Sequence, residues 1–277
     1  MAQKKVNAVI HSQEKLAEGI YSMWLDAPEM AKAAVPGQFI AVYTNDQSKL
    51  LPRPISICEA DKENGRLRIV YRIAGAGTKE FSAYKEGDTL DIMGPLGNGF
   101  PLKKKKAFLI GGGIGIPPML ELAKNLDCEK TAVIGYRDKE TFLADELRKY
   151  ADVVIATEDG SVGTKGNVID AIRAEKLTAD IIYACGPTPM LKALKTYAME
   201  NGIECYISLE EKMACGIGAC LGCVCHSKDI DEHSNVRNKR SCKDGPVFRA
   251  EEVELLTPDE QRERIASGIM IKKEEQA

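Results

Sequence analysis

The sequence has 277 residues, of which 44% are hydrophobic and 29% charged, and 38 basic residues against 41 acidic ones give a net charge of −3. These proportions are ordinary for a globular protein, and the length favours two domains with a small third. The balanced charge argues against a nucleic acid partner. The chain has no apolar signal core near its start and no run that approaches the roughly 18 apolar residues of a membrane span. We therefore expect a cytoplasmic protein without a membrane partner.

Residues 1–102 have the texture of antiparallel strands. Short runs rich in valine, isoleucine and tyrosine, such as GQFIAVYT and RLRIVYRIAG, are separated by turn signals such as Asn64-Gly65 and Gly94-Pro95. Several short strands with closely spaced turns are typical of an antiparallel barrel or sandwich. The first part of the chain is therefore predicted to be an antiparallel β domain.

Residues 103–206 follow a different pattern. The segments AFLIGGG, TAVIGYR, DVVIAT and DIIYACGP read as buried strands, and a helix-like segment follows each of them. Strands that alternate with helices predict a parallel sheet of the doubly wound type. The fold class is therefore β plus α/β, with several domains. Ligands in such sheets bind at the carboxyl ends of the strands.

Two of these strand ends contain candidate nucleotide-binding residues. GGGIGIPP follows the first strand and opens a helix, and YACGPTPM ends a later strand. Glycines let the backbone approach a diphosphate, and the first N–H groups of a helix point at it. The turn also suits simple strand–helix packing, and Cys185 also suits a small buried hydrophobe. The candidates are Gly112, Gly113, Gly115, Cys185, Gly186 and Pro187.

The β domain contains two further motifs. In RPISI, Arg53 suits a phosphate and Ser56 suits a hydrogen bond to a heterocycle. VYRIAGAGT places Tyr71 and Arg72 before a glycine-rich turn. Each motif alone also fits an ordinary barrel strand and its turn. The candidates for cofactor binding here are Arg53, Pro54, Ile55, Ser56, Val70, Tyr71, Arg72, Gly77 and Thr78.

The segment CGIGACLGCVCH holds four of the nine cysteines within twelve residues. In a reducing compartment such a cluster indicates a metal site rather than disulfides. The spacing Cys215-x4-Cys220-x2-Cys223, followed later by Cys242, is typical of a plant-type [2Fe–2S] cluster. Cys225 competes for the fourth position, but in an extended segment it would point away. A zinc site with four cysteines is the main alternative, and unligated thiols are the other.

Two histidines and the end of the chain have no assigned role in this pattern. With four cysteines available, His226 and His233 are expected to be polar surface residues. Residues 257–277 are strongly charged and are expected to form a loose helix or a frayed tail.

Taken in order, the motifs RPIS, GPLGNGF, GGGIGIPP and CGPTPM resemble those of the ferredoxin–NAD(P) reductase superfamily over about residues 5–205. Those proteins bind FAD on the barrel and a nicotinamide nucleotide on the α/β domain. The resemblance implies that Arg53 contacts an FAD phosphate, that Ser56 lies near the flavin ring, and that Gly77 and Thr78 cradle the diphosphate. Many members have an aromatic residue where this chain has Ile55, and Tyr71 is the alternative stacking partner.

The whole order, ending in MACGIGACLGCVC and SCKDGPVF, resembles the electron-transfer subunits of NAD-dependent, class B dihydroorotate dehydrogenases. This resemblance implies FAD, a [2Fe–2S] cluster and NAD as cofactors. It also implies a separate FMN-containing catalytic subunit for pyrimidine synthesis, in a heterotetramer with two copies of each subunit. Electrons would pass from the partner's FMN to the cluster, to FAD and to NAD⁺, with the cluster loop facing the partner.

A related group has the same architecture. The small subunits of bifurcating NADH-dependent ferredoxin:NADP oxidoreductases and of sulfide dehydrogenases typically have aspartate where this chain has Cys215. A nonenzymatic redox sensor or assembly factor, and a flavin reductase with another partner, are further alternatives. The preference for NAD or NADP is open, because Arg137 would attract the 2′-phosphate of NADP and Asp138 would repel it. No residue is assigned to acid–base catalysis.

The expected domain organisation follows from these motifs. We predict an FAD-binding barrel at residues 1–102 and an NAD-binding α/β domain at 103–206. A small [2Fe–2S] domain is expected at residues 207–250, and the tail follows at 251–277.

Overall fold

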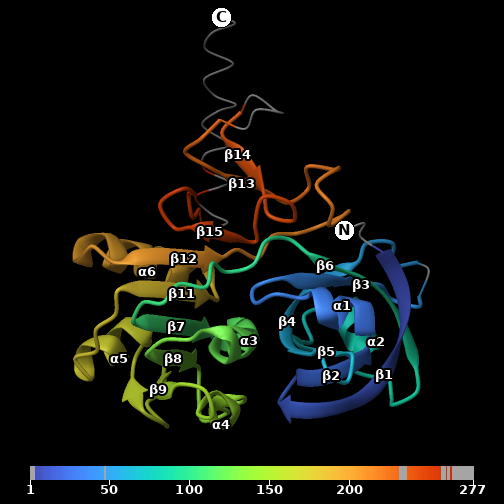
Figure 1. Cartoon of the computed structure of the whole chain (residues 1–277), viewed down its shortest axis with the longest axis horizontal. Helices are drawn as coiled ribbons and strands as arrows, with labels where there is room; N and C mark the ends of the chain where they lie inside the picture. The colour runs from blue at the N-terminus through green and yellow to red at the C-terminus, as the bar shows by residue number, and fades with distance from the viewer. Residues whose placement is uncertain (1–3, 47, 231–235, 257–259, 261–262, 264–277) are drawn as a thin grey trace, which may run out of the picture.

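The computed structural model describes residues 4–46, 48–230, 236–256, 260 and 263, and its parts are arranged as a barrel beside a sheet domain with the cysteine-rich segment across both (Figure 1). His233 and most of the predicted tail lie outside these residues. Within them, every helix is too short or too polar to span a bilayer.

In the described part of the chain, six antiparallel strands close the barrel. Their order around it is β1 (Lys4–Ala17), β2 (Ile20–Asp26), β5 (Arg66–Arg72), β4 (Arg53–Asp61), β3 (Phe39–Val42) and β6 (Thr89–Leu96). Isoleucine, leucine and methionine side chains alternate into the barrel and are fully buried, as period-two patterning predicts. Two short helices accompany the barrel, α1 (Pro28–Ala33) and α2 (Ala76–Phe81), and Phe81 of α2 packs into its core.

The second domain is a sheet of seven strands among the described residues. Its order is β10 (Thr164–Lys165), β9 (Asp152–Thr157), β8 (Lys130–Tyr136), β7 (Ala107–Gly112), β11 (Ile181–Cys185), β12 (Glu204–Ser208) and β15 (Val247–Arg249). The strands from β10 to β12 are parallel, as expected. Every residue of β7 and β11 is buried, because helices cover both faces of a parallel sheet.

Helices cover the two faces of this sheet in pairs. The helix α3 (Pro117–Asn125), which follows the short turn η1 (Gly113–Gly115), shares one core with α4 (Ala144–Leu147). The helices α5 (Val168–Ala174) and α6 (Thr188–Asn201) share the other. The core under α3 also includes Cys58 and Val70 of the barrel, so the two domains pack as one body.

The cysteine-rich segment is fastened to the sheet domain at both ends. It leaves β12, forms the small pair β13 (Val224–His226) and β14 (Asn238–Arg240), and returns as β15. β15 pairs with β12 and is antiparallel, which sequence patterning did not predict. The first residues of the predicted tail are also packed, since Val253 and Leu255 are buried in the core with α6.

A buried charge network joins the barrel to the sheet domain. The side chain of Arg68 on β5 is only 5% exposed, and its Nε donates to the Ser22 hydroxyl at 2.9 Å. Its guanidinium donates to Glu146 of α4 at 3.1 Å and lies 3.5 Å from Glu59 of β4. Lys124 of α3 binds the other oxygen of Glu59 at 2.6 Å. Removal of Arg68 would take this cation away from the partly buried Glu146 and leave Glu59 with Lys124 alone.

We predict that Arg68→Ala lowers the free energy of unfolding by about 2–3 kcal/mol, because the partner carboxylates lose their cation in a partly buried site. Urea denaturation followed by fluorescence measures this. Arg66→Ala is the matched control on the same strand, since the Arg66–Asp26 pair is 33% and 43% exposed and such pairs contribute about 0–1 kcal/mol. Equal losses for both variants would contradict the role of Arg68.

Candidate functional site

A cavity of about 470 Å³ lies against the barrel between β4, β5, α2 and the segment that leaves β12. Eight of the nine candidates from the barrel line it. They are Arg53, Pro54, Ile55, Ser56, Val70, Tyr71, Arg72 and Thr78. The structure therefore gathers these separate motifs around one space, which we call the barrel cavity.

Tyr71 forms a fixed wall of the barrel cavity. Its ring stacks on Tyr21 with centroids 5.9 Å apart, and its hydroxyl donates to Gln13 at 2.8 Å. Burial raises the pKa of Tyr71, so the phenol stays neutral. Ile55 lines the same space with an aliphatic side chain. The aromatic surface in this part of the cavity therefore comes from Tyr71, on the strand that neighbours Ile55.

Gly77 does not line the barrel cavity, but it contacts the side chain of Arg53, which does. A Cβ at Gly77 would lie 2.1 Å from the Nε of Arg53, so the arginine lies where a side chain at position 77 would otherwise be. The neighbouring Thr78 lines the cavity, and its hydroxyl accepts hydrogen bonds from the N–H groups of Ala74 at 2.8 Å and Gly75 at 3.2 Å. The Arg53 guanidinium and the Thr78 hydroxyl therefore lie on the same wall of the barrel cavity, beside the glycine-rich turn.

A second cavity of about 620 Å³ lies at the carboxyl ends of the parallel strands. Gly112 and Gly113 line it from the first strand end, and Gly186 and Pro187 line it from the later one. We call it the sheet cavity. It shares three wall residues with the barrel cavity, namely Arg72, Ile114 and Glu210. Ligands in the two cavities would therefore meet at these residues.

Gly115 and Cys185 line neither cavity, unlike the other candidates of the sheet domain. Cys185 is fully buried, and burial raises the pKa of its thiol. A Cβ at Gly115 would lie 2.3 Å from the Cys185 carbonyl oxygen. In this structure the two residues therefore bring a turn and a strand end into close contact, which is a packing role.

Two acidic residues that line the cavities, Glu158 and Glu210, were not identified from the sequence. Arg137 and Glu158 line the sheet cavity, whereas Asp138 does not and instead accepts a hydrogen bond from the Glu140 N–H at 2.9 Å. Glu158 directly follows β9, so its position at a strand end was a signal in the sequence. Glu210 lines both cavities, and burial raises the pKa of its carboxyl, opposed by the charge of Arg72.

The four predicted cysteine ligands come together beside the barrel cavity. Backbone N–H groups point at their sulfurs, as a negatively charged metal–thiolate centre requires. Gly218 donates to the Cys242 sulfur at 3.0 Å and Ala219 to the Cys215 sulfur at 3.3 Å. Gly222 donates to Cys220 at 3.4 Å, and the Cys242 N–H donates to the Cys223 sulfur at 3.4 Å. The loop is therefore built to stabilise thiolates.

The four thiols lie as two pairs. Cys215 is hydrogen-bonded to Cys220, and Cys242 to Cys223. Burial opposes ionisation of Cys215, but surrounding N–H groups and Cys220 outweigh it and lower its pKa to about 6. Among the described residues, no three His, Cys, Asp or Glu side chains are arranged to hold one metal ion. Two pairs of thiols are the donor set of a cluster with two irons, so these residues fit [2Fe–2S].

Cys225 is separate from this site. Its thiol donates to the Lys239 carbonyl at 3.4 Å, and its side chain is buried in the core of the sheet domain with Leu209 and Phe248. Burial raises its pKa to about 12, so the thiol is protonated. His226 is exposed. Both residues therefore lie where the sequence predicted them, away from the four cysteines.

Two side chains separate the cysteine site from the barrel cavity. Phe39 and Met213 line the barrel cavity, and both pack in one apolar cluster with Cys223 and Cys242. Phe39 lies opposite Ser56 in the barrel register. The cysteine site and the barrel cavity therefore have Phe39 and Met213 as a common apolar wall.

Two family models match the chain. Residues 7–100 match the oxidoreductase FAD-binding domain, and residues 210–254 match the iron–sulfur cluster binding domain of dihydroorotate dehydrogenase B. The first match covers the barrel with Arg53, Tyr71 and Thr78. The second covers the four paired cysteines. These matches confirm the FAD and iron–sulfur predictions and leave zinc without support.

Curated relatives match nearly the whole chain under the name dihydroorotate dehydrogenase B (NAD(+)), electron transfer subunit. The protein of a Geobacillus species is 43% identical over 264 residues, which are 92% of this chain and 100% of that protein. The protein of Bacillus velezensis is 42% identical over 261 residues, which are 91% of this chain and 100% of that protein.

Two solved structures extend the comparison. An NADH-dependent reduced ferredoxin-NADP oxidoreductase, described for flavin-based electron bifurcation, is 33% identical with a TM-score of 0.82 and covers 94% of this chain and 93% of that chain. The ferredoxin reductase of carbazole 1,9a-dioxygenase is 21% identical with a TM-score of 0.62, covers 73% of this chain and 67% of that chain, and shows the fold alone. The barrel, the sheet domain, the paired cysteines and the whole-chain relatives agree, and this chain belongs to the family of dihydroorotate dehydrogenase B electron transfer subunits.

Proposed function

We propose that this chain transfers electrons between a separate dihydroorotate-oxidising catalytic subunit and NAD⁺, in pyrimidine synthesis. The names of its relatives support the reaction, and one observation in the structure supports the route. The barrel cavity touches the sheet cavity through Arg72, Ile114 and Glu210, and it touches the cysteine site through Phe39 and Met213. A flavin in the barrel cavity would therefore stand between the other two sites.

Each group in this proposal has residues that fit it. Arg53 and Thr78 would hold the FAD phosphates, with Ser56 and Tyr71 beside the ring system. Gly112, Gly113, Gly186 and Pro187 would hold the nicotinamide nucleotide. Flavin exchanges electrons in pairs with nicotinamide and singly with an iron–sulfur cluster, which is the conversion that such an order of sites needs. The residues of the chain bind, orient and separate these groups.

The catalytic partner is expected to dock on the outer face of the cysteine site. Cys220 is exposed, and the apolar side chains of Ile217, Leu221 and Val224 around it are 45%, 46% and 38% exposed. Exposed apolar groups at a redox centre suit a protein interface that excludes water. We infer an FMN-containing catalytic subunit at this face, in a heterotetramer with two copies of each subunit, located in the cytoplasm.

A bifurcating oxidoreductase subunit is the second candidate. The 33% identity to such a protein over 94% of this chain supports it. The 43% identity to the dihydroorotate dehydrogenase B relatives is higher, and the first cluster position here is Cys215 rather than aspartate. These observations favour the dihydroorotate assignment.

The central test is orotate formation with and without the catalytic subunit. We expect the purified chain to oxidise NADH with artificial acceptors but to form no orotate from dihydroorotate. Addition of the FMN-containing subunit should give NAD⁺-dependent orotate formation, measured by absorbance. Orotate formation by the single chain at a comparable rate would refute the proposal, and dependence on ferredoxin and NADPH would support the bifurcating candidate instead.

Nucleotide preference is expected to depend on Glu158. Glu158 lines the sheet cavity, and its negative charge would repel the 2′-phosphate of NADPH, so the chain should prefer NADH. We predict that Glu158→Gln lowers the ratio of kcat/KM for NADH to that for NADPH by about tenfold. Asp138→Asn is the matched control, because Asp138 lies outside this cavity. A change with Asp138→Asn and none with Glu158→Gln would reverse the assignment.

The cysteine assignment has a direct test with two single substitutions. Cys242→Ser should lose most of the iron and acid-labile sulfide, because it removes a thiolate from one of the two pairs. Cys225→Ser should keep about two irons per chain and the electron paramagnetic resonance signal of the reduced cluster. Retention of a full cluster in Cys242→Ser, with loss in Cys225→Ser, would exchange the roles of the two residues.

A further inference from the structure

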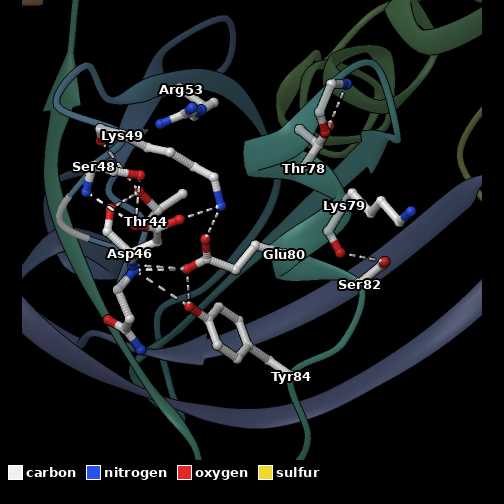
Figure 2. A network of polar contacts seen from close by, with 12 residues as sticks. Thr44, Asp46, Ser48, Lys49, Arg53, Thr78, Lys79, Glu80, Ser82 and Tyr84 are labelled. Atoms are coloured by element: carbon white, nitrogen blue, oxygen red, sulfur yellow. Dashed lines mark hydrogen bonds and ion pairs between the residues drawn. The ribbon is translucent and has the colours of Figure 1, made fainter.

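Glu80 on α2 binds Asn45, Asp46 and Lys49, which lie in the segment that precedes Arg53 in the sequence (Figure 2). Its carboxylate accepts hydrogen bonds from the Asn45 N–H at 2.7 Å and the Tyr84 hydroxyl at 2.6 Å. It also accepts from the Asp46 N–H at 3.3 Å and pairs with the Lys49 ammonium at 2.7 Å. The segment from Asn45 to Lys49 is therefore fastened to α2 through one carboxylate.

This segment runs directly into Arg53. Leu50 and Leu51, which connect Lys49 to the start of β4, are 83% and 56% exposed, so their side chains add little packing. The described part of the segment is also ordered internally, because Asp46 accepts from Ser48 and pairs with Lys49 at 3.0 Å. The contacts with Glu80 therefore set where Asn45, Asp46 and Lys49 lie relative to the barrel.

Glu80 and Gly77 lie three residues apart on α2, and such residues share one face of a helix. Gly77 contacts the Arg53 guanidinium, because a Cβ there would be 2.1 Å from Nε. One helix face thus touches Arg53 at Gly77 and holds the preceding loop at Glu80. Figure 2 shows Arg53, Lys49 and Glu80 on the same side of the barrel end.

The Glu80 carboxylate is ionised in this setting. Burial raises its pKa, but Lys49, Tyr84 and the two loop N–H groups outweigh burial and lower the pKa below the ordinary value. Its side chain is 17% exposed and that of Lys49 is 23% exposed, so solvent screens the pair only in part. Hydrogen bonds to a charged acceptor are stronger than those between neutral groups. Glu80 therefore makes the charged contacts of this attachment, beside the hydrogen bonds from Asn45 to the Tyr84 hydroxyl at 3.4 Å and to the Thr89 carbonyl at 3.3 Å.

We propose that Glu80 is a positioning residue for FAD, which holds Arg53 at the phosphate end of the barrel cavity without touching the cofactor itself. This rests on the proposed function, since it takes the barrel cavity as the FAD site. Without Glu80 the loop would leave α2, and Arg53 would sample other positions. In a variant without Glu80, FAD binding would have to order the Arg53 side chain, and this loss of conformational entropy would weaken the binding of FAD.

Glu80→Ala should weaken FAD binding to the reconstituted full chain by tenfold or more, on the order of 1.4 kcal/mol. FAD dissociation constants are measured by flavin fluorescence during titration of the apoprotein. Glu29→Ala on α1 is the matched control, an exposed glutamate of the same domain. The reduced cluster signal and the melting temperature of the apoprotein should change little. An unchanged FAD dissociation constant, or a loss that only follows a lowered melting temperature, overturns the proposal.

Two further measurements separate positioning from general stability. In an Arg53→Ala background, Glu80→Ala should weaken FAD binding no further, because the effect passes through Arg53. Glu80→Gln keeps an acceptor for the loop and loses the ion pair with Lys49, so its effect should be intermediate and close to that of Lys49→Ala. These milder variants also decide the matter if Glu80→Ala does not fold, and additive losses with Arg53→Ala contradict the proposal.

The outcome for the wild-type chain distinguishes this inference from the proposed function. If the wild-type chain binds no FAD, the proposed function fails. If the wild-type chain binds FAD and Glu80→Ala binds it equally well, only the role of Glu80 fails.

Discussion

The arrangement of the sites depends on the pairing of β12 with β15. Ser208 lies opposite Val247, and the Leu209 N–H donates to the Pro246 carbonyl at 2.9 Å. The whole cysteine-rich segment is a loop between these two paired strands. Its first residues, 208–213, form a wall of the barrel cavity before the chain reaches Cys215. The sheet hydrogen bonds offset the entropy of closing so long a loop, and they hold the four thiols beside the cavity.

A second constraint is the joint between the barrel and the sheet domain. The core under α3 includes residues of both domains, and the Arg68 network crosses the same boundary. This joint brings the end of β5, with Arg72, against η1, with Ile114. The two cavities consequently meet at fixed residues. Transfer of a hydride needs its donor and acceptor in near contact, so a rigid joint suits the proposed chemistry better than a hinge.

The local motifs were informative where backbone geometry alone decides the outcome. Gly112 lines the sheet cavity at the end of β7, whereas Gly77 lies in α2 against the Arg53 side chain and lines neither cavity. Prediction was less successful for individual side chains at the ends of the parallel strands. Glu158, rather than Asp138, lines the sheet cavity, and Cys185 turns into the core. Asp138 follows β8 and Glu158 follows β9, and sequence spacing alone does not show which of two neighbouring strand ends supplies a side chain to the cavity.

The sequence by itself determined the classes of domain, the four cysteine ligands that were proposed, and twelve of the residues that line the two cavities, because periodicity, glycine turns and thiol spacing are local properties of the chain. Only the tertiary structure decided that β15 joins the sheet, that Glu210 and Arg72 stand between the cavities, and that Phe39 and Met213 separate the flavin cavity from the thiols. The tertiary structure also decided that Glu80 binds Asn45, Asp46 and Lys49. Such contacts join residues far apart in the chain, and they exist only after the domains have packed.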